Sequence, residues 1–130
     1  MSKYSFTGTQ LIQKVRDIAA GNPDFIYSIP EEEGGDTCMY WHTGSNSLGC
    51  IMGHALTELG VDKNDIGEGD NIIAVLEGIL GKDHHLVDLV NRKQQEWLQK
   101  VQKEQDTGTH TWSEAVRFTD EYMKQFGVEV

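Results

Sequence analysis

Two capping boxes, one near each end of the chain, mark where the first and the last helix begin. In Thr7-Gly-Thr-Gln10 the threonine hydroxyl can accept a hydrogen bond from the third amide, while the glutamine reaches back to the cap. Thr111-Trp-Ser-Glu114 has the same spacing. Apolar residues at helical spacing follow each box, so the sequence predicts two amphipathic helices, the first stopped by Gly21 and Pro23 and the second by Gly127.

The apolar positions also predict which face of each helix is buried. In the first helix the core-facing residues are Leu11, Ile12, Val15, Ile18 and Ala19. The residues left facing solvent are Gln13, Lys14, Arg16 and Asp17. In the last helix the apolar stripe consists of Trp112, Ala115, Val116, Phe118, Met123 and Phe126. We expect Trp112 to be a core anchor, since a large aromatic side chain gains most from burial.

Three more helices are predicted between these two. The first runs from Cys50 to Leu59 and closes at Gly60, and the second covers residues 71–80 with Asp70 as its N-cap. The second is apolar nearly all round, which places it in the core. The third is one long helix over about 83–106, whose glutamine-rich middle is interpreted as helix surface.

A small β-hairpin is expected beside these helices. Residues 25–29 and 37–42 are rich in aromatic and β-branched side chains, and an acidic loop separates them. Residues 43–49 are interpreted as a second turn. The predicted fold is therefore mainly α, with about five helices and this hairpin in a compact single domain of residues 1–130.

The charge balance limits the classes of partner. The chain of 130 residues has 11 Lys and Arg against 21 Asp and Glu, which gives a net charge of −10. This negative charge argues against binding to the phosphate backbone of nucleic acids, because phosphate contacts need basic residues. No apolar run approaches the roughly 18–20 residues of a membrane span, and no signal peptide is visible. We therefore expect a cytoplasmic protein with reduced cysteines and a partner that carries a basic patch.

Four possible metal ligands, Cys38, His42, Cys50 and His54, gather within residues 37–56. Thiolate and imidazole are the ligands that zinc prefers. Cys50 and His54 lie one turn apart on a predicted helix and can share one ion. Cys38 and His42 lie in a predicted strand, where four residues span roughly 13 Å, whereas two atoms on one zinc lie only about 3.5–4 Å apart. We therefore expect at most one of Cys38 and His42 to bind the same ion as Cys50 and His54. No cofactor is expected, and the alternative is one zinc ion bound by three residues.

Cys50 is also a candidate nucleophile. It follows Gly49 at a predicted helix start, where amide dipoles lower the pKa of a thiol. His42 or His54 would supply the base of a cysteine-dependent hydrolase or transferase. No catalytic signature surrounds the cysteine, and no orienting Asn or Asp can be assigned.

Three sequence motifs carry a resemblance. They are Asn22-Pro-Asp-Phe-Ile-Tyr27; Cys38-x-Tyr40 with Gly49-Cys-Ile-Met-Gly-His-Ala-Leu56 and Leu59-Gly60; and Gln102-x-x-Gln-Asp106-x-Gly108-x-x-x-Trp112-x-x-Ala115. With these motifs the chain resembles a group of small uncharacterised proteins of actinobacteria and their bacteriophages. That group has no assigned activity, so the resemblance implies an origin, with the host cytoplasm as location if phage-encoded, and no mechanism.

The sequence thus supports three hypotheses in order. The first is a small acidic, non-enzymatic phage-type protein that acts by binding a host or phage protein. The second is a zinc-stabilised domain that uses Cys50, His54 and one of Cys38 or His42. The third is a cysteine-dependent enzyme built on Cys50 with His54 or His42. An incomplete catalytic set and the strong negative charge favour the first.

Overall fold

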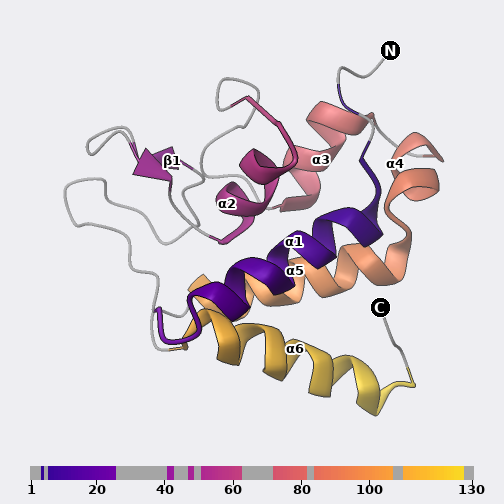
Figure 1. The fold of residues 1–130 in the computed structure, drawn as a ribbon. Coiled ribbons are helices and arrows are strands. Elements are labelled where there is room, and N and C mark those ends of the chain that lie inside the picture. Colours follow the sequence, from indigo (N-terminus) through magenta and orange to yellow (C-terminus); the bar gives the residue numbers. More distant parts are fainter. Residues whose placement is uncertain are drawn as a thin grey trace.

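The computed structural model describes residues 4, 6–25, 41–42, 47–48, 51–62, 72–81, 84–106 and 110–127, and this part of the chain is mainly helical (Figure 1). In order, its elements are α1 (Gly8–Gly21), β1 (Trp41–His42), β2 (Ser47–Leu48), α2 (Ile51–Glu58), α3 (Ile72–Leu80), α4 (His84–Leu89), α5 (Arg92–Asp106) and α6 (Trp112–Gln125). The predicted predominance of helix is confirmed.

Helices α1 and α5 lie side by side through the middle of the molecule (Figure 1). Helices α2 and α3 cover one side of this pair, and α6 covers the other. The buried apolar side chains form one hydrophobic cluster to which all these helices contribute. Burial of such a cluster is the main favourable term in folding, at roughly 25 cal/mol per Å² of apolar surface.

Both predicted capping boxes are confirmed. The amide of Thr7 donates to Gln10 Oε1 at 2.9 Å, and the amide of Gln10 donates to Thr7 Oγ1 at 3.3 Å. At α6 the amides of Thr111 and Glu114 each donate to the other's side chain at 3.0 Å. Because each box satisfies amides that the helix itself leaves unpaired, both starts are set by local sequence.

The single long helix predicted over 83–106 is wrong, because α4 ends at Leu89 and α5 begins at Arg92. Asn91 caps α5: its Oδ1 accepts from the amide of Gln94, and its own amide donates to Gln94 Oε1, both at 2.9 Å. This reciprocal pair is a third capping box with Asn in place of Thr. The described part of the chain therefore has six helices where the sequence predicts about five.

Two glutamines of α5 hold the starts of two other helices. Gln105 Oε1 accepts from the amide of Ile51, the first residue of α2, at 2.7 Å. Gln102 Oε1 accepts from the amide of Ile72, the first residue of α3, also at 2.7 Å. Both side chains are buried, so the interpretation of this glutamine-rich stretch as helix surface is wrong for these two residues. The predicted N-cap Asp70 lies outside the described residues.

Predicted helix ends at Gly60 and Gly127 are confirmed, with φ of 89° and 71°, the left-handed region that favours glycine. The strands form a two-residue antiparallel pair, with Trp41 opposite Leu48. The segment 43–49, interpreted as a turn, thus contains β2. The predicted pairing of 25–29 with 37–42 falls mostly outside the described residues.

Candidate functional site

His54 is the predicted site residue that the structure describes most fully. It lies on α2, half-buried, with its ring 5.2 Å from the ring of Trp112 at an interplanar angle of 69°. For His42 the structure describes only the backbone, in β1, and Cys38 and Cys50 lie outside the described residues. The imidazole of His54 thus takes part in an aromatic contact between α2 and the start of α6.

Trp112 is the centre of that contact and is only 2% exposed. Its amide donates to the carbonyl of Phe25 at 2.9 Å, and the two rings lie 4.5 Å apart at 51°. The prediction that Trp112 is a core anchor is confirmed. Its buried indole N–H has no hydrogen-bond acceptor among the residues that the structure describes, which is unusual for a buried donor.

The start of α2 bears on the cysteine hypothesis, because Ile51 follows Cys50 in the chain. The amide of Ile51 is bound by Gln105 at 2.7 Å. A thiolate at a helix start is stabilised by unpaired amides and by the helix dipole. One of those amides is therefore already satisfied by a neutral carboxamide, which removes part of the argument for a reactive Cys50.

The zinc hypothesis concerns the same segment, residues 37–56. Within the ranges described above, no three His, Cys, Asp or Glu side chains meet in a way that could hold a metal ion. Of the four predicted ligands, only the side chain of His54 is within those ranges. A zinc site that uses Cys50, His54 and one of Cys38 or His42 therefore stays a prediction.

A second polar cluster joins α1, α5 and α6. Arg16 pairs with both carboxylate oxygens of Asp120, at 2.8 and 2.9 Å, and its guanidinium lies 4.9 Å from the ring centre of Trp97. The indole of Trp97 donates to Asp120 Oδ1 at 2.9 Å. The prediction that Arg16 simply faces solvent is wrong, because a carboxylate from a helix distant in sequence comes within reach. This cluster connects three helices, so its evident role is structural.

The pKa of Asp120 reflects the balance within this cluster. Partial burial by itself would raise the pKa of the carboxyl. The hydrogen bonds from Arg16 and Trp97, together with the charge of Arg16, outweigh it and hold the pKa below its ordinary value. Asp120 is therefore ionised at neutral pH, and its charge belongs to an ion pair that is already satisfied.

The outer edge of α6 carries exposed aromatic rings. Tyr122 is 43% exposed and Phe126 is 68% exposed, and their rings lie 5.2 Å apart edge to face. The prediction that Phe126 joins the buried stripe is wrong, because it lies at the C-cap of α6. Cations border this edge: Lys100 lies 4.8 Å above the Tyr122 ring, and Arg117 lies 5.0 Å from the Phe118 ring.

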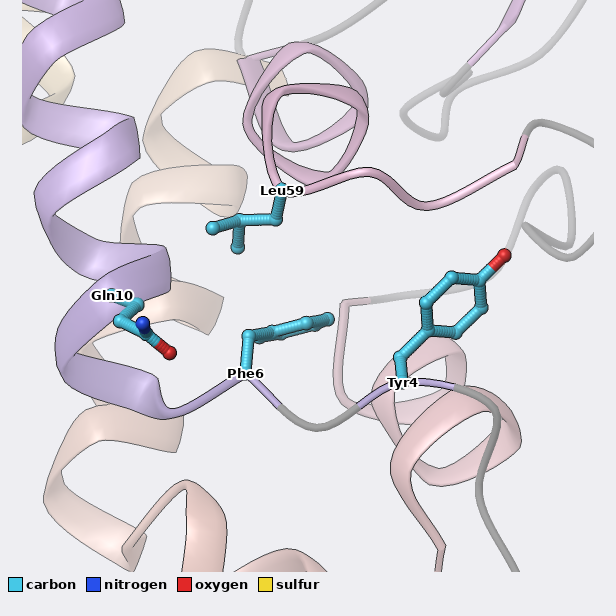
Figure 2. A pocket seen from close by; sticks show the side chains of 4 residues that line it. All are labelled: Tyr4, Phe6, Gln10 and Leu59. Carbon is cyan, nitrogen blue, oxygen red and sulfur yellow. The ribbon is translucent and has the colours of Figure 1, made fainter.

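A surface pocket of about 270 Å³ lies at the N-terminal end of α1. It is lined by Tyr4, Phe6, Gln10 and Leu59, with the Phe6 ring between Gln10 and Tyr4 (Figure 2). The Tyr4 hydroxyl accepts from the amide of Asp62 at 2.9 Å, and the carboxamide oxygen of Gln10 accepts in the α1 capping box. The pocket combines apolar lining with polar atoms engaged in folding, so it shows no chemistry for a particular ligand.

Charge is distributed unevenly along the chain. Residues 92–127, which include α5 and α6, carry six basic and six acidic side chains. The rest of the chain carries five basic and fifteen acidic side chains, which accounts for the whole net charge of −10. Within the described residues of 51–62, 72–81 and 84–91 there are four acidic side chains and no Lys or Arg. Among the described residues, the segments of α2, α3 and α4 are therefore acidic, while α5 and α6 taken together are balanced.

Comparison of the chain with protein-family models, with curated proteins and with solved structures gives no match in any of the three. Among the residues that the structure describes, no helix is both long and apolar enough to cross a bilayer.

Proposed function

We propose that this protein is a non-enzymatic, phage-type protein-binding module whose partner, a host or phage protein, carries a basic patch. The observation that supports the proposal is the uneven distribution of charge. All of the excess negative charge lies outside residues 92–127, and the described parts of α2 and α3 share one side of the α1–α5 pair. An excess of negative charge on one side of a protein steers a partner of opposite charge and orients it on arrival.

The side chains on this acidic side are available for contact. Glu58 on α2 is exposed, as is Asp62 just beyond it, and Glu77 on α3 is half-buried. The described residues of these segments include no Lys or Arg, so the charged side chains that they contribute are all acidic. A basic partner would form charge-assisted hydrogen bonds with exposed carboxylates such as Glu58.

A capture experiment with matched charge variants tests the proposal. Immobilised protein is exposed to lysate of an actinobacterial host at physiological salt, and the bound proteins are identified. Glu58→Lys is expected to weaken capture of a basic partner by roughly three- to tenfold, and added salt should do the same. Glu96→Lys is the control, because Glu96 is also exposed but lies on α5 in the balanced segment.

Two results would contradict the proposal. One is that no specific partner is recovered at physiological salt. The other is that Glu58→Lys and Glu96→Lys weaken capture equally, since the two substitutions change the net charge by the same amount. In that case only the overall charge would matter, and the side formed by α2 and α3 would have no special role.

A further inference from the structure

One face of α6 is partly exposed: Lys100 lies over Tyr122 and His110 packs against Phe118, but Phe126 is 68% exposed. The buried face of this helix consists of Trp112, Ala115, Thr119 and Met123. Next to it run Phe118, Tyr122 and Phe126, spaced four residues apart, of which the last two are exposed and in ring contact. Figure 1 shows α6 on the outside of the helix pair, away from α2 and α3. An exposed aromatic row bordered by charge is typical of a contact surface.

A row of charges with alternating sign runs beside the aromatic row. Glu114, Arg117, Glu121 and Lys124 follow one another at spacings of three, four and three residues, so they share one side of the helix. Glu114 is half-buried, and the other three are exposed. Reading this row backwards inverts every sign. It therefore complements itself over its full length when the second helix runs antiparallel, because a parallel copy in register would place like charges together.

We propose that α6 is the contact between two copies of this chain, packed antiparallel about a twofold axis level with Thr119, next to Phe118. That position is close to the midpoint of α6, Trp112–Gln125, so the two helices overlap along their whole length. Each Glu114 then lies opposite Lys124 of the other copy, and each Arg117 lies opposite Glu121. The symmetry forms both pairs twice and brings the two Phe118 rings near the axis.

The overall charge favours a second copy at this face. Two molecules of net charge −10 repel each other over most of their surfaces. The repulsion is least where the charges balance, and that is the segment 92–127, to which α6 belongs. The self-contact goes beyond the proposed function, since it leaves Glu58 and Glu77 on the opposite side for a different partner.

Sedimentation velocity of the full chain tests for the dimer. The aromatic row is small, so association is expected between about 10 µM and about 1 mM, the range of small interfaces. Replacing Tyr122 and Phe126 together by Ser is expected to abolish it, with the helical circular dichroism unchanged because both side chains are exposed. A wild-type chain that stays monomeric up to about 1 mM would overturn the inference, whatever the outcome of the capture experiment.

A charge swap tests the antiparallel arrangement. Arg117→Glu alone and Glu121→Arg alone each turn two opposite-charge pairs into like-charge pairs, which should weaken the dimer by about tenfold. The double variant Arg117→Glu/Glu121→Arg places opposite charges together again, so it should dimerise like the wild type. An equimolar mixture of the two single variants should also associate more tightly than either alone. If the double variant stays as weak as the single variants, the proposed arrangement is wrong.

Discussion

Two glutamines one turn apart on α5 make the strongest prediction about stability. Gln102 and Gln105 are buried, and each accepts a hydrogen bond at 2.7 Å from the first amide of another helix. Neither bonded amide can find a partner inside its own helix, because the first four amides of any helix lack one. Without the glutamine oxygens, these amides of Ile51 and Ile72 would be left buried and unpaired.

Replacement by methionine isolates this effect. Methionine has a similar length and a similar helix propensity, but its sulfur is a poor acceptor. An unsatisfied buried amide costs about 1–3 kcal/mol, so Gln102→Met and Gln105→Met are each expected to destabilise the protein by that amount. For a chain of this length, the loss corresponds to roughly 3–12 °C in Tm. It is also a large fraction of a typical total stability of about 5–15 kcal/mol.

Urea denaturation followed by tryptophan fluorescence measures the change. Gln99→Met is the matched control, because Gln99 is on the same helix and exposed, and its replacement should stay within about ±0.5 kcal/mol. The reasoning is refuted if Gln105→Met unfolds at the same urea concentration as Gln99→Met. It is also refuted if all three variants lose stability equally, since the effect would then come from methionine on the helix.

Because the pKa of Asp120 is depressed, its contribution is present above about pH 4 and lost below it. The stability difference between wild type and Asp120→Asn, about 1–2 kcal/mol at pH 6 after allowance for partial exposure, should therefore shrink towards zero by about pH 2 in acid denaturation. Trp97→Phe breaks the hydrogen bond from the indole to Asp120, whereas Trp112→Phe removes a donor that has no described acceptor. Trp97→Phe should therefore lower the free energy of unfolding by about 1–3 kcal/mol more than Trp112→Phe, as measured by chemical denaturation. Equal costs would show that the second indole also has a partner. The zinc hypothesis is tested by elemental analysis of protein purified without chelator or metal-affinity tag. If Cys50 and His54 bind zinc, the protein should contain about one equivalent of the metal. Less than about a tenth of an equivalent rules the site out.

Local chemistry explains which parts of the fold could be predicted. The starts of α1 and α6 follow from capping boxes four residues long, and the ends of α2 and α6 follow from glycines with positive φ. The break between α4 and α5 is also marked locally, by the capping pair Asn91 and Gln94. The apolar stripe continues across residues 86–101, however, and this pattern predicts one uninterrupted helix. Periodicity alone cannot reveal a break that keeps the buried face in phase.

The candidate site was less predictable, because its contacts join distant segments. The sequence indicates that His54 lies on a helix, but not that the ring of Trp112 packs against it. The exposure of Phe126 depends on where α6 ends relative to its neighbours, and helical spacing carries no such information. The side chains of Cys38, His42 and Cys50 are not described, so their convergence stays a prediction.

By itself, the sequence determined the helical class, two helix starts and the imbalance of charge, since each depends on residues close together in the chain or on a sum over it. Only the tertiary structure decided that Gln102 and Gln105 cap other helices, that Arg16 pairs with Asp120 and that Tyr122 and Phe126 of α6 are exposed. These features need groups far apart in sequence to be brought together. Hydrophobic burial offsets the loss of conformational entropy when these groups come together. The pattern of apolar residues predicts which helix faces meet, but not which polar atoms form hydrogen bonds with each other.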